Sequence, residues 1–341
     1  MHRVSPQLFL VSAAVMLLLA LLLGLLSGPV DIAPGKLLGL LFSGGNSGGM
    51  DERILTSIRL PRVLLAALAG ACLASCGAVM QGLFRNPLAD PSLIGVSSGA
   101  SMGASCVIFL GGTTLLGGIV QLSAVALGAF VGGLLATALV YRLATTVTGT
   151  SVSTMLLAGI AITALAGAAT SLFSFFADNE MLRRISLWQM GNLDSASWSR
   201  VAIIAAVVLP LVGVLPREGR ALNAILLGES EARHLGVAVE SLKRRLILLT
   251  ALGVGVAVAV SGVVAFVGLI VPHLVRLMIG PDHRYLIPGS ALLGAVLLLL
   301  ADTGARTLMA PAELPTGVVT ALLGAPFFVA LLVQRRRKVL D

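Results

Sequence analysis

Charged side chains are scarce in this chain of 341 residues, and so are aromatic ones. Charged residues make up 11% of the sequence and hydrophobic residues 57%, whereas soluble globular domains usually carry about 25% charged residues. Mean hydropathy is +1.02, and this composition excludes a water-soluble protein. Aromatic residues amount to only 4%, while glycine occurs 39 times, which favours helices packed closely through small side chains. We therefore expect an all-α polytopic membrane protein.

Sequence signals for catalysis are also missing. The three cysteines, Cys72, Cys76 and Cys106, lie inside apolar runs, so we interpret them as small packing residues and not as a disulfide framework or a metal site. The sequence has no cluster of His and Cys with metal-ligand spacing, no nucleophile elbow and no G-x-x-x-x-G-K-[ST] phosphate loop. We predict that the chain is not an enzyme and has no cofactor or metal of its own. If ATP drives its action, a separate subunit must hydrolyse the nucleotide.

The net charge of +8 does not indicate a nucleic-acid partner, because the basic residues are spread over short segments between apolar runs. They indicate the orientation in the membrane instead, since Lys and Arg accumulate on the cytoplasmic side. With both termini in the cytoplasm, 15 of the 23 Lys and Arg residues are cytoplasmic, Arg3 among them. The periplasmic minority requires its own explanation. It consists of Lys36, Arg53, Arg59, Arg62, Arg183, Arg184, Arg200 and Arg306.

Apolar runs of about 20 residues, the length that crosses a bilayer, predict ten transmembrane helices. The first is too long for the apolar core of a signal peptide and is expected to remain in the protein. The boundary between the seventh and eighth helices depends on Ser261 and Gly262 alone, and a single helix there would place the termini on opposite sides. We expect one transmembrane domain, residues 1–341, without a soluble domain. The predicted helices cover residues 7–28, 60–83, 93–111, 119–141, 152–176, 198–215, 244–262, 263–279, 286–305 and 315–333.

Glycines recur at four-residue spacing in the third and fourth predicted helices. They are Gly95, Gly99 and Gly103 in the third helix, and Gly128 and Gly132 in the fourth. Such faces let helix backbones approach closely. We interpret them as packing within the bundle and not as a dimerisation signal.

One carboxylate, Asp302, falls near the outer end of the ninth predicted helix, and Arg306 follows four residues later. At this spacing the two side chains lie on one helix face and can neutralise each other. Alternatively, Arg306 faces outward toward a partner. An ion-coupled transporter usually places carboxylates in mid-membrane, so a secondary transporter without an ATPase is the less favoured class.

The longest cytoplasmic loop, residues 216–245, is too polar to cross the membrane and too apolar to be a free linker. Short amphipathic segments alternate around Gly228 and Gly236, which predicts a compact pair of short helices on the membrane surface. The pair either packs under the bundle or forms a docking knob for a soluble partner. The apolar side chains that it would bury are Ile225, Leu226, Leu227 and Leu235.

Three long motifs accompany this loop in the sequence. They are R-L-P-R at residues 59–62, R-N-P-L-A-D-P-S-L-I-G-V-S-S-G-A at 85–100 and A-E-L-P-T-G-V-V-T-A-L-L-G-A-P at 312–326. From the second predicted helix to the last, the chain resembles the iron-siderophore, haem and vitamin B12 permease family of ABC importers. The resemblance implies the type II importer permease fold, a homodimer of ten-helix subunits in the bacterial inner membrane. It also implies two cytoplasmic ATPases, which bind ATP and Mg, and a periplasmic binding protein.

The resemblance further implies roles for individual residues. The pattern G-E-x-x-A-R-x-L-G would form coupling helices that meet the ATPase; its residues are Gly228, Glu229, Ala232, Arg233 and Gly236. The arginines that would pair with acidic residues of the binding protein are Arg59, Arg62 and Arg306. The two cytoplasmic gate segments correspond to Asn86, Pro87 and Leu88 and to Ser151, Val152 and Ser153. Small polar and apolar side chains at a gate suit a large hydrophobic cargo.

Haem is the predicted cargo, because the motif at 85–100 and the segment M-L-R-R-I-S-L-W-Q-M-G-N-L-D-S-A-S-W at 181–198 look most like the haem branch of the family. A ferric siderophore or cobalamin is the alternative. The chain's histidines and tyrosines all fall at predicted cytoplasmic ends. We therefore expect haem to pass without strong ligation of its iron.

The predicted contacts with the cargo lie in a periplasmic re-entrant segment of about residues 178–197. There, Arg183 and Arg184 could meet the two propionates of haem, or they could cap a short helix or face lipid headgroups. Aromatic and thioether side chains suit contact with the ring. These are Met181, Trp188 and Met190.

Overall fold

The computed structural model describes residues 4–28, 30, 35, 49–111, 118–147 and 149–340. Arg3 and Lys36, which entered the orientation argument, lie outside the described residues, as does His2. The described chain is almost entirely helical. Its only sheet is a two-stranded hairpin in which β1 (Thr145–Thr146) pairs antiparallel with β2 (Gly149–Thr150).

Ten of the described helices correspond to the ten predicted transmembrane segments. Seven of them lie in segments long and apolar enough to cross a membrane. They are α1 (Pro6–Leu26), α4 (Leu60–Leu83), α6 (Gly118–Ala144), α7 (Val152–Phe176), α9 (Trp198–Val214), α12 (Val239–Ser261) and α14 (His283–Thr307). Three more are α5 (Val96–Gly111), α13 (Val267–Ile279) and α15 (Thr316–Leu340), whose apolar parts are shorter. The prediction of an all-α multi-pass membrane protein is confirmed.

The uncertain boundary between the seventh and eighth helices is a true break in the chain. Helix α12 ends at Ser261, and Gly262 takes a positive φ of 67° that favours glycine. The carbonyl of Ser261 accepts a hydrogen bond of 2.8 Å from the backbone N–H of Asn192. Because this segment satisfies its backbone groups inside the protein, it can interrupt the helix at membrane depth.

Short elements connect the long helices. Before α4, the chain already turns as a helix through α3 (Met50–Arg53) and η1 (Ile54–Arg59), so this helical segment is longer than predicted. The remaining short elements are η2 (Pro91–Ile94), α8 (Asn179–Gln189), η3 (Leu215–Glu218), α10 (Gly219–Leu227) and α11 (Glu229–His234). The predicted cytoplasmic loop therefore ends earlier than expected, since residues 239–245 form the first turns of α12.

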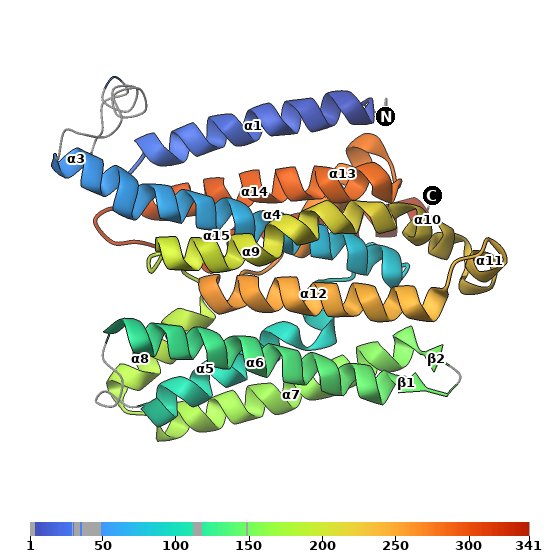
Figure 1. Ribbon diagram of the computed structural model, residues 1–341, viewed down its shortest axis with the longest axis horizontal. Coiled ribbons are helices and arrows are strands. Elements are labelled where there is room, and N and C mark those ends of the chain that lie inside the picture. Colours follow the sequence, from blue (N-terminus) through green and yellow to red (C-terminus); the bar gives the residue numbers. More distant parts are fainter. Residues whose placement is uncertain are drawn as a thin grey trace.

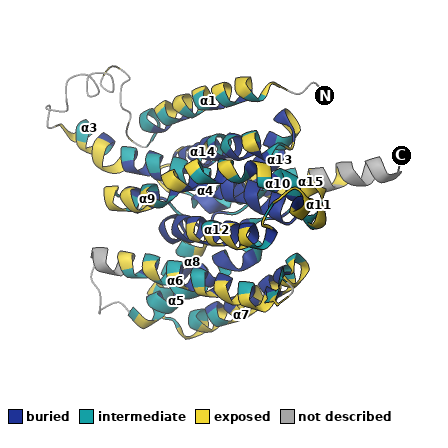
Figure 2. Cartoon of the chain, turned by 45° about the vertical axis from the view of Figure 1, so that its right-hand side comes forward, coloured by how far each residue is buried: buried dark blue, intermediate teal, exposed yellow. Residues whose placement is uncertain are grey.

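The long helices lie side by side and form a bundle (Figure 1). Helix α1 covers one edge, where it packs on α14; α4 and α12 lie toward the centre; α5, α6 and α7 form the opposite side. Burial is greater in the middle of the bundle than at its outer faces (Figure 2). Helices α4, α12 and α14 are mostly buried, whereas α1 and α7 expose apolar side chains such as Leu18 and Leu165. Apolar outer faces of this kind suit contact with lipid or with another subunit.

The glycine faces bring α5 and α6 into close contact, as predicted. A Cβ atom added to Gly103 would lie 2.1 Å from the carbonyl oxygen of Gly128, and one added to Gly99 would lie 2.4 Å from that of Gly132. Only glycine allows this approach of the two backbones. The pattern therefore serves packing within the chain.

The start of α1 and the end of α15 lie at the same end of the bundle as α10, α11 and the β1–β2 hairpin (Figure 1). Helices α3 and α8 lie toward the opposite end (Figure 1). An even number of membrane crossings gives this arrangement. We call the two ends of the bundle the α11 end and the α3 end.

Candidate functional site

The predicted coupling segment is a pair of short helices at the α11 end. Gly228, with a φ of 127°, separates α10 from α11, and Gly236, with a φ of 83°, follows α11. Both backbone conformations favour glycine. The Oδ1 atom of Asn223 on α10 accepts a hydrogen bond of 3.0 Å from the backbone N–H of His283 at the start of α14. The predicted turns at both glycines are therefore present, and α10 is fixed to the bundle.

The outer face of this helix pair carries exposed leucines. Leu222, Ile225 and Ala232 are buried, as expected for Ile225. Three of the loop's leucines do not pack under the bundle: Leu226, Leu227 and Leu235 are 40%, 69% and 64% exposed. An amphipathic helix of two turns has only one side to bury, so these leucines point away from the bundle. This favours the docking interpretation over simple packing.

The two predicted gate segments are polar turns at helix ends. In the first, Asn86 is exposed and its Oδ1 atom accepts a hydrogen bond of 3.0 Å from the backbone N–H of Leu88, while Pro87 and Leu88 are half-buried. In the second, Ser151 is the N-terminal cap of α7 and accepts from the backbone N–H of Thr154. Ser151 and Ser153 are exposed and Val152 is half-buried. The role of both segments as gates stays a prediction.

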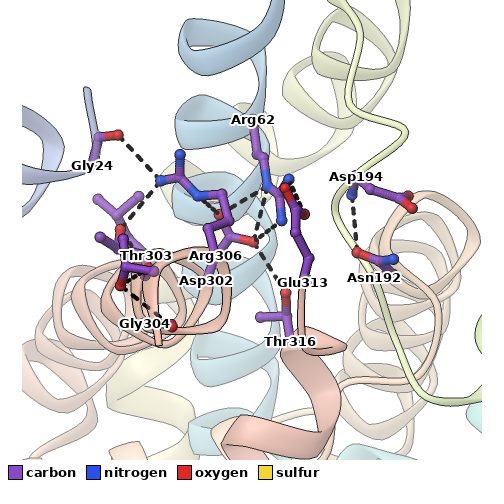
Figure 3. Close-up of polar contacts among 12 residues, drawn as sticks. Gly24, Arg62, Asn192, Asp194, Asp302, Thr303, Gly304, Arg306, Glu313 and Thr316 are labelled. Atoms are coloured by element: carbon purple, nitrogen blue, oxygen red, sulfur yellow. Dashed lines mark hydrogen bonds and ion pairs between the residues drawn. The ribbon is translucent and has the colours of Figure 1, made fainter. Parts of the chain in front are cut away.

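An ionic cluster, buried except for Glu313, lies at the α3 end, between α4, α14 and the start of α15 (Figure 3). Arg62 Nε lies 3.1 Å from both carboxylate oxygens of Asp302, and Arg62 Nη1 donates to Glu313 Oε2 at 2.7 Å. Arg306 Nε lies 3.2 Å from Asp302 Oδ2, and the Thr316 hydroxyl donates to Asp302 Oδ1 at 3.0 Å. Asp302 is fully buried and is shared by two arginines. We call these five residues the Asp302 cluster.

The expectation that the three docking arginines face outward is not met. Arg59, Arg62 and Arg306 are only 3%, 5% and 3% exposed. Arg59 donates to the backbone carbonyls of Leu25, Leu26 and Val30, and Arg306 donates to that of Gly24. Buried guanidinium groups require such partners because desolvating a charge is costly. The alternative, that Asp302 and Arg306 neutralise each other, agrees with the structure.

Two members of the Asp302 cluster, Glu313 and Thr316, were not singled out from the sequence as functional residues. They belong to the motif at 312–326, but Glu313 is 251 positions away from Arg62. Only the fold brings them together. The sequence signal that could have identified them is the presence of two polar residues, Glu313 and Thr316, in an otherwise apolar motif.

The predicted re-entrant segment contains α8, which begins at an Asp178 cap that accepts from the backbone N–H of Met181. Ile185 anchors α8 in the core, while Arg183 is exposed and Arg184 is half-buried. Among the described residues, neither arginine has a hydrogen bond or an ion pair within the chain. Met181 and Trp188 are partly buried, whereas Met190 is 44% exposed.

A cavity of about 180 Å³ opens beside α8, α5, α6 and α12. Arg184, Trp188 and Arg200 line it, together with Asp194 and apolar residues of α5 and α6. It is smaller than the 300–1,000 Å³ typical of pockets that enclose a whole ligand. The cavity is therefore too small to enclose a large ligand completely. The described histidines and tyrosines do not line this cavity.

These observations define a class of protein: a multi-pass helical membrane permease, with an exposed helix pair at one end and a buried ionic cluster at the other. Residues 16–334 match the FecCD transport family, and the chain belongs to this family. The curated relatives include the hemin transport system permease protein HmuU of Yersinia pestis, 48% identical over 84% of each chain. They also include the vitamin B12 import system permease protein BtuC of Salmonella paratyphi A, 40% identical over 96% of each chain.

Two solved structures also share the fold of this chain. An inward-facing transporter described as a metal-chelate type ABC transporter superposes with a TM-score of 0.83 at 32% sequence identity, over 95% of this chain and 98% of the other. PsaBC from Streptococcus pneumoniae shares the fold, with a TM-score of 0.55 at 19% identity. The predicted permease fold is thereby confirmed.

Proposed function

We propose that this permease carries haem from the periplasm to the cytoplasm as the membrane-spanning subunit of an ATP-driven importer. It would act as a homodimer in the bacterial inner membrane, with both termini and the α11 end in the cytoplasm. Two ATPase subunits would bind ATP and Mg there, and a periplasmic binding protein would deliver the cargo to the α3 end.

The exposed face of the α10–α11 helix pair is the observation that carries the ATPase assignment. Leu227 and Leu235 are two-thirds exposed, and Arg233 between them is 56% exposed. Apolar side chains next to an arginine are typical of the core of a protein interface. The carboxylate of Asp302 is bound by two arginines, so it is not a free group for ion coupling. This supports ATP as the energy source over a secondary transporter.

Haem as the cargo is supported by the chemistry of the α8 cavity. Arg184 and Arg200 present positive charge beside Trp188, a combination that suits a flat apolar ring with carboxylate groups. The relative HmuU is a hemin permease, at 48% identity. Cobalamin is the second candidate, because BtuC of Halobacterium salinarum, a cobalamin permease, is 45% identical over 84% of this chain.

Docking of the binding protein through Arg59, Arg62 and Arg306 stays a prediction. It would require these side chains to leave their buried partners. Rim ion pairs usually act on the rate and register of association more than on its strength. The exposed side chains at the α3 end, such as Met50, are accessible without any such movement.

The cargo is tested by ATP hydrolysis of the complex reconstituted in lipid with its ATPases and binding protein. We expect stimulation by the binding protein loaded with haem, and not by the same protein loaded with cobalamin or a ferric siderophore. Arg184→Ala should reduce haem uptake more than the exposed neighbour Arg183→Ala, because Arg184 lines the cavity. Stimulation by a siderophore alone would overturn haem as the cargo.

A further inference from the structure

Lys243, in the first turns of α12, is an unusual residue because its side chain is buried. It is only 2% exposed, whereas lysine is almost never fully buried unless it is paired. Its Nζ atom lies 2.7 Å from Glu229 Oε2, 2.9 Å from the carbonyl oxygen of Thr150 and 3.2 Å from Glu240 Oε1. An ammonium group has three hydrogens to donate, and here each has an acceptor. The acceptors belong to α11, β2 and α12.

On one side, Lys243 holds the segment that leads into a predicted gate. Thr150 is bound at both of its backbone groups, since its carbonyl accepts from Lys243 and its N–H donates to Glu240 Oε2 at 2.8 Å. Gly149 has a φ of 120°, and a Cβ atom there would lie 2.8 Å from the Glu240 carboxylate. The next residue, Ser151, starts α7 and its gate segment. The position of Thr150 therefore determines where α7 begins.

On the other side, Lys243 holds the first residue of α11. Glu229 follows the Gly228 turn directly, and its carboxylate also lies 3.7 Å from Arg233, the exposed arginine of the proposed ATPase interface. Arg233 reaches Glu240 as well, at 3.9 Å. Any displacement of α11 by a bound subunit therefore acts first on the Glu229 carboxylate and on Lys243.

We propose that Lys243 is a positioning residue that makes α11 and the start of α7 move as one unit. The proposal rests on the proposed function, which places an ATPase on α11. If α11 moved alone, the buried ammonium would lose Glu229, its only acceptor on α11 among the described residues. Losing the nearer of its two carboxylate partners is unfavourable for a buried ammonium, because only Glu240, at 3.2 Å, would then balance its charge. The less costly response is for Thr150, and with it Ser151, to follow α11.

A matched pair of variants separates this transmission from simple stabilisation. Lys243→Met keeps the length of the side chain but removes the ammonium. Arg245→Met, two residues further on α12, removes a second ion pair, that of Arg245 with Glu218 at 3.0 Å, which has no link to Thr150. Both variants lose one cation from the same helix. Only the first breaks the connection between α11 and the gate.

The experiment measures uptake per ATP hydrolysed by the complete complex in proteoliposomes. It also measures the distance between spin labels placed within one subunit at two exposed positions, Val147→Cys in the hairpin and Ser230→Cys on α11, in a Cys106→Ser background. In the otherwise unchanged protein, we expect this distance to stay constant between the nucleotide-free and ATP-bound states. In Lys243→Met, the distance should change with nucleotide and uptake per ATP should fall about tenfold, as expected for losing a charged hydrogen bond. Arg245→Met should match the unchanged protein.

Lys243→Met overturns the proposal if its uptake per ATP and its label distance equal those of the unchanged protein, or if Arg245→Met shows the same losses. If Lys243→Met does not assemble, Glu229→Gln provides the test, since this variant keeps a hydrogen-bond acceptor but removes the charge of the carboxylate. An unchanged uptake per ATP in Glu229→Gln also overturns the proposal. The label distance requires no cargo. A wrong cargo would therefore abolish uptake in the unchanged complex and leave the distance result intact, whereas a missing ATPase interaction would prevent the unchanged complex from assembling with its ATPases.

Discussion

Replacing Asp302 by alanine removes the one carboxylate that two buried arginines share. Arg62 keeps Glu313, at 2.7 Å from its Nη1 atom. Arg306 keeps only neutral partners among the described residues, such as the carbonyl of Gly24 at 3.1 Å. With Arg306 only 3% exposed, water cannot replace the lost charge. We therefore expect a large loss of stability, centred on Arg306.

The size of the loss follows from opposing terms. Opposite charges about 4 Å apart attract by about 4 kcal/mol at an effective dielectric constant of 20, and the desolvation of each ion offsets much of this gain. Removing one partner of a buried pair leaves the desolvation cost uncompensated and destabilises by about 3–5 kcal/mol. We expect this range for Asp302→Ala. Asp302→Asn keeps the shape and an acceptor, so it should cost about 2 kcal/mol.

The assay is the free energy of unfolding in mixed detergent micelles, measured by titration with a denaturing detergent. The double variant Asp302→Ala with Arg306→Met should recover part of the loss, because it removes the uncompensated cation together with the carboxylate. A change within about 0.5 kcal/mol for Asp302→Ala, the range of ordinary surface substitutions, would refute the reasoning. It would mean that the cluster is hydrated.

Two further predictions concern the α5–α6 contact and the start of α14. Gly103→Ala should lower the thermal unfolding midpoint markedly, since its Cβ would meet the Gly128 carbonyl at 2.1 Å, whereas Gly167→Ala, with open space around it, should not. Hydrogen bonds from Arg284 lower the pKa of Asp282 to about 2, below its usual value of about 3.9. Because the folded-state pKa is depressed, the stabilisation is present above about pH 4 and is lost as the pH falls through about 2. Asp282→Asn should show less loss of unfolding free energy over this pH range than the unchanged protein, and an equal loss would contradict the prediction.

The positions of the membrane helices could be predicted from the sequence, because an apolar run of bilayer length has one stable outcome in lipid. Even the break at Gly262 was visible as a lone interruption. What could not be predicted was the burial of individual side chains. Arg62 and Glu313 lie on segments that meet only in the folded bundle, and the family resemblance implied arginines that face a binding protein. Likewise, the exposure of Leu227 and Leu235 depends on which side of a two-turn helix meets the bundle.

The burial of these side chains changes the explanation of the arginines predicted to be periplasmic. Arg59, Arg62 and Arg306 are neutralised or solvated inside the protein by carboxylates and backbone carbonyls. Orientation depends on free positive charge near the membrane surface, so these three do not oppose the rule and need no partner to explain them.

The cations on and beside α8 are of a different kind. Arg200 donates to Ser195 and to the carbonyl of Val260, whereas Arg183 and Arg184 have no partner within the described chain. A half-buried guanidinium group beside Trp188 is costly to leave unpaired, and an anionic ligand would relieve that cost. Arg183 and Arg184 therefore place free positive charge on α8, where the proposed path for a dianionic apolar cargo begins.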